Sequence, residues 1–175
     1  MISLKFFQKQ DYDQLINCVE SPAFLLQWAG PDFHYPLTYE QLDNYIHEAN
    51  KQDSTTFIYK AVDLNTNQTV GHIGLKNIDR HNRSVRVGKV LVYKEARGQG
   101  VGRRMMEEIL SIAFLQLDMH KVTLGVFDFN KPAVQAYKNA GLKIDGLLRD
   151  HRRFENEYWS LFEMSILYPE WKSST

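Results

Sequence analysis

Apolar and polar residues alternate with a period of two at the start of the chain, where Ile2, Leu4 and Phe6 are separated by Ser3 and Lys5. This alternation is typical of a β-strand with one buried face. Six later stretches, rich in β-branched and aromatic residues, are also predicted as strands. They are residues 55–62, 69–77, 85–93, 121–126, 142–149 and 157–167. The last two are expected to form a hairpin, and its register stays open because residues 158–163 do not alternate cleanly.

Other segments space their apolar residues three or four positions apart, which predicts helices. Capping-box spacing starts one helix at Asp11 and a second at Thr38. A third helix, of about four turns, begins near Gly100, and a fourth runs from Pro132 until Gly141 ends it. The order β-α-α-β-β-β-α-β-α-β-β predicts an α/β fold of the α+β kind. We expect a mixed, mostly antiparallel sheet flanked by helices, in a single domain that spans residues 1–175.

Two stretches depart from simple periodicity. Residues 21–37 contain three prolines and many large apolar side chains, so they are expected to be irregular and to pack either at the edge of the core or as the wall of a substrate pocket. Trp28, Asp32 and Tyr35 are its candidate substrate-binding residues. Within residues 85–93 the alternation changes phase near Gly88 and Lys89, which favours a β-bulge over a strand buried on both faces.

Composition narrows the class of protein. The 175 residues carry a formal net charge of zero with a pI near 7, which gives no pull toward nucleic acid or an acidic membrane surface. The single cysteine, Cys18, excludes an internal disulfide and favours a reducing compartment. No apolar run approaches the roughly 20 residues that span a bilayer, and no signal peptide precedes the first strand. We expect a cytoplasmic protein without a membrane or nucleic-acid partner.

A glycine-rich loop joins the strand of residues 85–93 to the long helix that follows. The first amides of a helix lack partners within it and carry partial positive charge, so they can bind an anion such as a phosphate. A Walker-type loop would need Lys and then Ser or Thr after Gly102, and a dinucleotide loop would need glycine at Arg103. The pattern Arg-x-x-Gly-x-Gly fits at Arg97, Gly100 and Gly102. A turn that binds nothing is the alternative.

This last pattern resembles the coenzyme A pyrophosphate loop of the Gcn5-related N-acetyltransferases (GNAT family). A second motif, Asn130-x-x-Ala133-x-x-x-Tyr137-x-x-x-Gly141-Leu142, is similar to another motif of that family. The two motifs occur in the family's order, and the predicted element order runs almost end to end like the family's fold. The end of the chain, including Glu170 and Trp171, is similar to the RimJ/RimL-like branch.

The resemblance implies a role for each motif residue. Main-chain groups of Leu91, Val92 and Tyr93 would bind the pantetheine arm, and Arg103 or its neighbour Arg104 would reach the 3′-phosphate unless they only form a solvated helix face. The amides that would hold the pyrophosphate are those of Arg97, Gly98, Gln99, Gly100, Val101 and Gly102.

Two further residues have a structural alternative to the role that the resemblance implies. Asn130 would bind the cofactor arm or cap a helix, and these roles are compatible. Tyr137 would donate a proton to the departing thiolate, or it is a core tyrosine.

The implied activity is transfer of an acetyl group from acetyl-CoA to a primary amine, by direct attack in a ternary complex and without a metal. A strand amide, taken as that of Val92, would stabilise the oxyanion. Relatives can carry a glutamate base where this chain has Gly125, so Asp32, His72 and Asp128 are the candidates for a base. His72 is also kept as a candidate substrate-binding residue.

The acceptor and the assembly stay open. A small-molecule amine or a protein amino terminus is the expected acceptor, and the lack of a strongly acidic tract in residues 21–37, where Glu20 and Asp32 are the nearest carboxylates, argues against a polycation. Arg149, Arg152 and Arg153 favour an acceptor with a carboxylate, unless they serve only solubility. A non-catalytic acyl-CoA sensor and a nucleotide-binding domain are the alternatives from other classes. The aromatic final hairpin would suit a homodimer.

Overall fold

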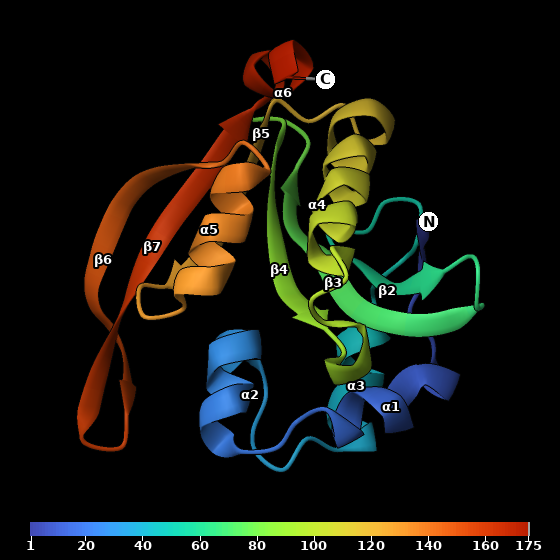
Figure 1. The fold of residues 1–175 in the computed structure, drawn as a ribbon, viewed down its shortest axis with the longest axis vertical. Coiled ribbons are helices and arrows are strands. Elements are labelled where there is room, and N and C mark those ends of the chain that lie inside the picture. The colour runs from blue at the N-terminus through green and yellow to red at the C-terminus, as the bar shows by residue number, and fades with distance from the viewer. Residues whose placement is uncertain (175) are drawn as a thin grey trace.

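The computed structural model describes residues 1–174, and within them a seven-stranded sheet runs in the order β1-β2-β3-β4-β5-β7-β6 (Figure 1). Every neighbouring pair is antiparallel except β4 and β5, which are parallel. The predicted mixed, mostly antiparallel sheet is therefore confirmed. The strands are β1 (Ile2–Phe6), β2 (Phe57–Asp63), β3 (Gln68–Asp79), β4 (Ser84–Val92), β5 (Lys121–Phe127), β6 (Lys143–Phe154) and β7 (Glu157–Leu167).

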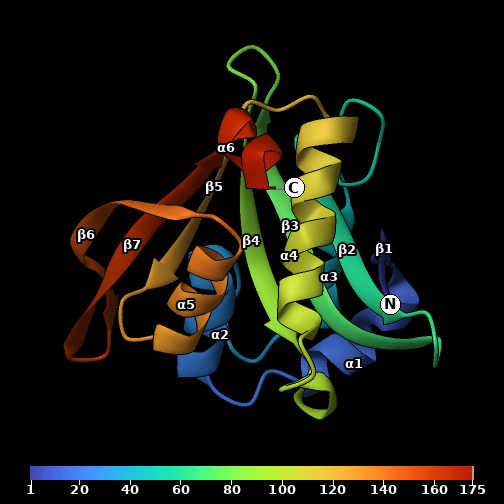
Figure 2. The same ribbon diagram turned by 45° about the horizontal axis from the view of Figure 1, so that its top comes forward.

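Helices cover both faces of the sheet. On one face α4 (Val101–Ser111), which continues as a π-helical stretch Ile112–Gln116, lies beside α5 (Lys131–Asn139), as Figure 2 shows, and α6 (Tyr168–Ser174) packs on the same core. On the other face lie α1 (Tyr12–Asn17), α2 (Pro22–Ala29) and α3 (Tyr39–Ile46). Short 3₁₀ turns occur at Lys9–Asp11, Gly30–Asp32 and Lys94–Ala96.

The alternation along the strands divides the apolar side chains between these two faces. On β2, Phe57 and Tyr59 belong to the core under α4, whereas Ile58 between them belongs to the core under α1 to α3. Period-two side-chain placement therefore builds two hydrophobic cores from one sheet. Met105 is completely buried in the first core and Leu42 in the second.

The observed element order adds two helices to the predicted one, α2 and α6. The prediction that residues 21–37 are irregular is wrong for Pro22–Ala29. The Ser21 side chain accepts a hydrogen bond from the Phe24 amide at 3.1 Å, and Pro22 occupies the first turn, where a missing N–H costs nothing. The helix then buries Leu25 and Ala29 against the second core.

Both predicted helix starts are confirmed, but only one has the expected side-chain cap. Thr38 caps α3 by accepting from the Gln41 amide at 3.3 Å, as expected. Asp11 does stand at the start of α1, but its side chain does not cap that helix; its carboxylate accepts from the Gln8 amide at 2.9 Å and closes the 3₁₀ turn before α1. The same carboxylate forms an ion pair with Lys60 at 2.6 Å.

The predicted bulge in β4 is confirmed. Residues His72 and Gly74 of β3 pair with Leu91 and Gly88, so β4 carries one more residue than its partner over this interval. The extra residue is Lys89, whose φ of 51° is in the left-handed region. Beyond it the strand changes phase as the sequence indicated: Val90 and Val92 pack toward the first core, and Leu91 is buried in the second.

The final hairpin has irregularities that explain its unclear sequence pattern. Its register shifts between Ile144 and Gly146 and again between Leu148 and Arg152. Because each shift changes which face a side chain occupies, no single alternation runs along β6.

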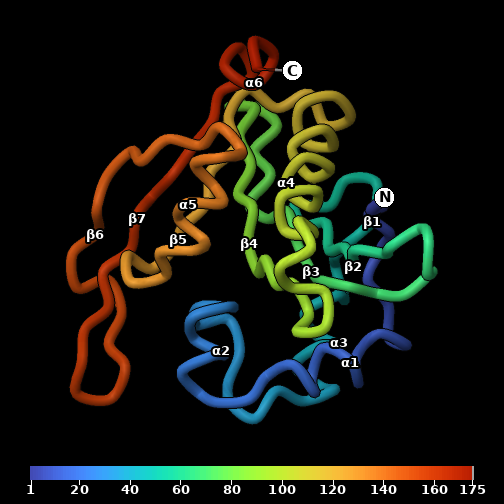
Figure 3. The backbone as a smooth tube through the Cα atoms, viewed as in Figure 1, coloured from blue at the N-terminus to red at the C-terminus, as the bar shows by residue number. Residues whose placement is uncertain are grey.

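The parallel strands β4 and β5 stay together for only a short distance. They pair where Ser84–Arg86 meets residues 121–123 and then separate, and the separation is visible in the chain trace (Figure 3). The bulge in β4 follows immediately after the paired part.

Among the helices of residues 1–174, none combines the length and apolar character that crossing a bilayer requires.

Gly71 provides a test of how tightly β3, β4 and α4 pack. A Cβ at this position would lie 2.6 Å from the Leu91 carbonyl oxygen and 2.8 Å from the Met105 sulfur. We expect Gly71→Ala to lower the free energy of unfolding by roughly 1–3 kcal/mol, because backbone must shift to admit the methyl group. Gly146→Ala is the matched control, since a Cβ there meets no atom within 4 Å. Chemical denaturation should show a change of less than about 0.5 kcal/mol for the control; equal stability of the two variants would contradict this packing.

Candidate active site

A cavity of about 540 Å³ occupies the gap where β4 and β5 separate. It is closed on one side by α2 and on the other by the start of α5. Because β4 and β5 no longer pair with each other here, main-chain groups on their facing edges are left to bind another molecule. The cavity brings together Trp28, Leu91, Val92, Arg97, Asn130 and Tyr137 of the predicted site, with Phe24, Gln27, Val87, Gly88, Lys89, Val90, Leu124, Gly125, Val126, Phe127, Pro132 and Ala133.

The start of α4 has the features of an anion site. Within residues 1–174 no side chain caps this helix, and its first turn contains no acidic residue. Gly98 and Gly100 have φ values of 75° and 73°, which glycine adopts without strain, and the loop thereby leads into the helix with its amides free. Gln99 and Arg103 bind elsewhere, to the Glu95 carbonyl at 3.0 Å and to Glu107 at 2.8 Å.

Arg97 fastens this loop to the end of β4. Its Nε donates a hydrogen bond to the Val92 carbonyl oxygen at 3.1 Å, and its side chain lines the cavity. Gly102 faces the same residue, because a Cβ there would lie 3.3 Å from a methyl group of Val92. The loop, the helix start and the last turn of the strand therefore form one unit, which joins the anion site to the cavity.

Asn130 begins α5 at the opposite wall. Its Oδ1 accepts from the Ala133 amide at 3.3 Å, so the predicted capping role is confirmed. This bond uses the side-chain oxygen and leaves the amide nitrogen as a donor. Asn130 also lines the cavity, so capping and cofactor binding are compatible.

Tyr137 lies about two turns further along α5 and also lines the cavity. Its hydroxyl has no hydrogen-bond partner among the described residues, and burial raises its pKa to about 12. The helix end is fixed by two bonds across Gly141, from Leu142 N to the Tyr137 carbonyl at 3.0 Å and from Gly141 N to the Lys138 carbonyl at 2.9 Å. The phenol is therefore held in place and stays protonated at neutral pH.

His72 lies in the second core, away from the cavity lining. It is completely buried, its ring meets those of Phe7 and Trp28 edge to face, and its Nε2 is 3.2 Å from the Tyr45 hydroxyl. Burial, with a smaller effect from the charge of Lys89, lowers its pKa to about 3. The imidazole is thus neutral and enclosed, and its geometry gives no support to a role as base.

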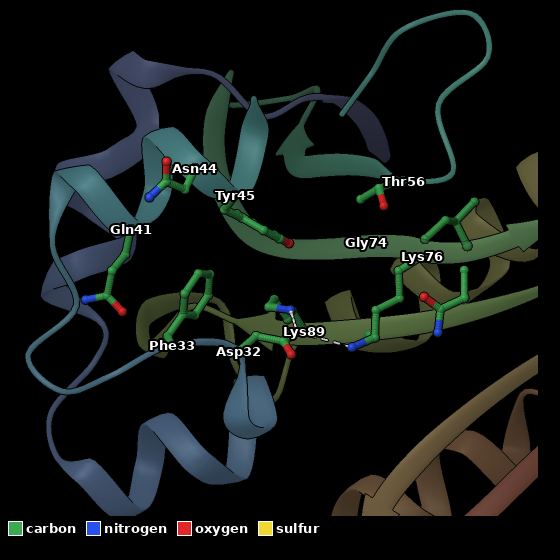
Figure 4. A pocket seen from close by; sticks show the side chains of 12 residues that line it. Asp32, Phe33, Gln41, Asn44, Tyr45, Thr56, Gly74, Lys76 and Lys89 are labelled. Carbon is green, nitrogen blue, oxygen red and sulfur yellow. Dashed lines mark hydrogen bonds and ion pairs between the residues drawn. The ribbon is translucent and has the colours of Figure 1, made fainter. Parts of the chain in front are cut away.

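Asp32 forms an ionic cluster with two lysines, and Figure 4 shows its carboxylate between them. Its Oδ2 is 2.5 Å from Lys89 Nζ and 3.2 Å from Lys76 Nζ. Burial raises the pKa of Asp32, but the two ammonium groups outweigh burial and the net shift is downward. Lys89 is itself only 7% exposed and lies over the rings of Phe33 and Tyr45. This cluster borders a second cavity of about 410 Å³ on the α3 side of β4.

The remaining positions to be placed relative to the cavity are Tyr35, Asp128 and Gly125. Tyr35 is 47% exposed and Asp128 is half-buried, and neither lines the cavity between β4 and β5. Gly125 does line it, but the space for a side chain there is filled, because a Cβ would lie 2.5 Å from Arg86 Nη2. Arg86 binds both oxygens of Glu163, the residue opposite Gly125 on β7.

Among the described residues no cluster of His, Cys, Asp and Glu side chains could hold a metal ion.

Comparison with known proteins supplies the family. The model of the acetyltransferase (GNAT) family matches residues 23–142. The chain belongs to this family.

Two GNAT relatives illustrate the sequence similarity. An uncharacterized N-acetyltransferase, YokL, of the SPbeta prophage in Bacillus subtilis (strain 168), is 30% identical over 117 residues, 66% of this chain and 63% of the relative. An uncharacterized N-acetyltransferase, p20, of Bacillus licheniformis is 22% identical over 106 residues, 61% of this chain and 59% of the relative. The matched segments thus span less than two thirds of either relative.

Solved structures share the GNAT fold over nearly the whole chain. The spermidine N-acetyltransferase of Vibrio cholerae in complex with CoA and spermine has a TM-score of 0.85 at 21% identity, over 98% of both chains. A dodecameric structure of spermidine N-acetyltransferase from the same organism has a TM-score of 0.80 at 20% identity, over 99% and 98%. At this identity the likeness confirms the predicted fold.

Gly100 allows the anion site to be tested by charge alone. Asp and Asn are nearly the same shape and both tolerate the left-handed backbone of this position. Coenzyme A should bind Gly100→Asp at least about tenfold more weakly than Gly100→Asn, because only the aspartate repels a diphosphate at the helix start. Isothermal titration calorimetry measures both affinities, and thermal unfolding checks that both variants are folded. Equal affinities would show that the diphosphate binds elsewhere.

Proposed function

We propose that this protein transfers an acetyl group from acetyl-CoA to a primary amine, by direct attack of the amine in a ternary complex. One observation carries the proposal: the cavity between the separating strands β4 and β5 is joined through Arg97 to the uncapped start of α4. A ligand with a diphosphate at one end and a long thin arm fits this shape. Membership of the RimJ/RimL-like branch stays a prediction, as does a cytoplasmic location.

The residues present suit coenzyme A. Amides of Gly98 to Gly102 would hold the diphosphate, whereas the predicted Arg97 amide already donates to the Lys94 carbonyl at 3.3 Å. Main-chain groups of Leu91 and Val92, with the free amide nitrogen of Asn130, would bind the arm. Tyr93 does not line the cavity, and its amide donates to the Val70 carbonyl at 2.9 Å. Arg103 is exposed and paired with Glu107, and a 3′-phosphate would compete for it. Acetyl-CoA supplies an acetyl group that is already activated as a thioester. The protein therefore mainly has to position an amine and exclude water.

Two groups would assist the transfer. A main-chain amide at the end of β4, taken as that of Val92, would donate to the carbonyl oxygen as it gains negative charge. The Tyr137 phenol, protonated and without another partner among the described residues, would donate to the sulfur as it departs. With a pKa of about 12, the phenol is a weaker acid than a thiol of pKa about 8.5, so hydrogen bonding is expected to contribute more than complete proton transfer.

The amine must lose its proton before it attacks. Within the described cavity lining between β4 and β5 there is no carboxylate, and Gly125 stands where some relatives, those that modify ribosomal protein amino termini, can carry a glutamate. Asp32 is held by two lysines and His72 is enclosed, so proton loss to water is the route that this site supports best. The same lack of a base is the observation that favours a non-catalytic acyl-CoA sensor as the second candidate.

The acceptor is proposed to be a small-molecule amine or a protein amino terminus. The spermine complex of the Vibrio cholerae enzyme is a property of that protein, and this chain's cavity lining is not acidic. A homodimer also stays a proposal, supported by exposed apolar side chains on the final hairpin, namely Ile144, Leu147, Leu148 and Tyr158.

A thiol-release assay with acetyl-CoA and a panel of amines separates the two candidate functions. An enzyme should release free thiol in proportion to acetylated amine, at a rate well above hydrolysis without amine. A sensor should be stabilised against thermal unfolding by acetyl-CoA while releasing thiol no faster with any amine. Stabilisation by ATP or NAD but not by coenzyme A would contradict both and support a nucleotide-binding domain.

Replacing Tyr137 by phenylalanine tests the proposed proton donor. We expect the kcat of Tyr137→Phe to fall roughly 10- to 100-fold with coenzyme A binding unchanged, because a hydrogen bond to a charged group is worth about 1.5–3 kcal/mol. Tyr158→Phe is the matched control, since Tyr158 is 60% exposed on β7. An unchanged kcat at saturating substrates would remove Tyr137 from the mechanism.

The pH profile of the wild-type protein provides an independent check. Because burial raises the pKa of Tyr137 to about 12, its phenol keeps its proton throughout the assay range. The kcat/KM should therefore rise from about pH 6 as the amine deprotonates and should not fall before about pH 10. A falling limb below pH 10 that disappears in Tyr137→Phe would show that the phenol titrates lower than its surroundings imply.

A further inference from the structure

A third cavity, of about 170 Å³, continues the cleft between β4 and β5 toward the β6–β7 hairpin. The two cavities share several lining residues, among them Trp28, Gly88 and Gly125. The second cavity, near α3, shares only Gly88 and Lys89 with the cleft. The third cavity thus shares more of its lining with the cleft than the second cavity does, and an amine that enters through it would reach the cleft beside the β4 bulge.

Basic side chains dominate the third cavity. Its lining includes Lys76, Arg86, Lys89 and Arg152 but no carboxylate. Two carboxylates reach these cations from outside the lining: Glu163 binds Arg86, and Asp32 is shared by Lys76 and Lys89. Four cations thus face two carboxylates, and the cavity keeps an excess of positive charge.

Among these four cations, Arg152 is the one whose positive charge is not paired with a carboxylate of residues 1–174. It is half-buried on β6 and has neither an ion pair nor a hydrogen bond to any described residue. The neighbouring His151 is affected by the same positive charges. Burial, followed by the charges of Arg152 and Arg86, lowers the pKa of His151, and the charge of Glu163 opposes this only in part. A guanidinium held at a cavity wall without a carboxylate partner can bind an anion in a two-pronged manner.

Arg86 lies too far from the start of α4 to serve the coenzyme's phosphates. The anion site at the start of α4 follows the end of β4 at Val92, whereas Arg86 lies six residues earlier on the same strand. Six strand residues span about 20 Å. The positive charge at this end of the cleft is thus available to the acceptor.

Building on the proposed function, we propose that the acceptor amine carries an anionic group, a carboxylate, which binds Arg152 in the third cavity while its amine enters the cleft at the bulge. A polyamine would instead bring further positive charge to a cationic wall. Lys76 borders the same cavity and supports the carboxylate by its charge, although it also serves Asp32. Arg152 acts as a specificity-determining residue in this arrangement.

Matched acceptors test the proposal on the wild-type protein. Each α- and ω-amino acid is compared with its carboxamide and with the diamine of the same length, using acetyl-CoA and thiol release. The carboxylate member of the best series should have a kcat/KM at least about tenfold above both partners, since a charge-assisted bond is gained only there. Equal or better turnover of the carboxamides, the diamines or spermine would overturn the proposal.

Three variants locate the effect. Arg152→Gln should reduce kcat/KM for the carboxylate acceptor at least about tenfold, leave its carboxamide unchanged and leave coenzyme A affinity unchanged. Arg152→Lys should recover part of the loss. Arg153→Gln is the matched control, because Arg153 is the exposed neighbour whose side chain bonds only the Glu155 carbonyl, and it should behave as wild type. An Arg152→Gln protein that keeps the carboxylate preference would overturn the proposal.

The assays distinguish a failure of the proposed acetyl transfer from a failure of the proposed anionic subsite. If no amine of any charge accelerates thiol release, the proposed acetyl transfer is wrong. If transfer occurs but favours neutral or cationic amines, acetyl transfer stands and only the anionic subsite is wrong. Should Arg152→Gln prove unfolded in thermal unfolding, the wild-type comparison of matched acceptors still decides the question.

Discussion

The separation of β4 from β5 is the constraint on which the site depends. The strands pair only where Ser84–Arg86 meets residues 121–123, and one inserted residue, Lys89, then bends β4 and reverses which residues face each core. A regular parallel pair would have used its facing main-chain groups in its own ladder. Because the strands part instead, those groups border a cavity, and the end of β4 is delivered to the loop that starts α4.

A buried charge holds this bend in position. Lys89 is nearly inaccessible, and burial lowers its pKa; Asp32 at 2.5 Å opposes this shift only in part, and the rings of Phe33 and Tyr45 also face the ammonium. Removing one partner of such a pair leaves an uncompensated buried charge, which is far more costly than the small net gain from the intact pair. The contact also fastens the turn after α2 to the sheet, so the wall that bears Trp28 is fixed relative to the bulge.

Local features of the site were predictable, and long-range ones were not. The glycine loop, the Asn130 cap and the Gly141 helix end each lie within a few residues, so their spacing indicates their structure. The bulge was visible because alternation slips at Gly88 and Lys89. The helix Pro22–Ala29 lies in a stretch whose three prolines predict irregular structure, but its Ser-Pro start is a local signal that indicates a helix N-terminus.

The charges around the cleft could not be placed in the same way. Lys89 stands at the predicted slip, yet nothing local indicates that Asp32, 57 positions away, would hold it. Glu163 lies opposite Gly125 only in the observed register of β5 and β7, and the irregular alternation of the last hairpin hid the neighbouring register of β6. Arg152 was one of three arginines that sequence could not tell apart; the shift before it in β6 brings it to the cavity, whereas Arg153 stays exposed.

Gly125 leaves the cleft between β4 and β5 without a carboxylate base at this position. A carboxylate there would accept the proton of the acceptor, but here Arg86 occupies the space and Glu163 neutralises it. The cations of the third cavity do not replace that base, because Arg86 is paired with Glu163, Lys89 with Asp32, and Arg152 would be paired with the acceptor's carboxylate. The positive cavity wall would thus serve selection of the acceptor, and the amine's proton would pass to water.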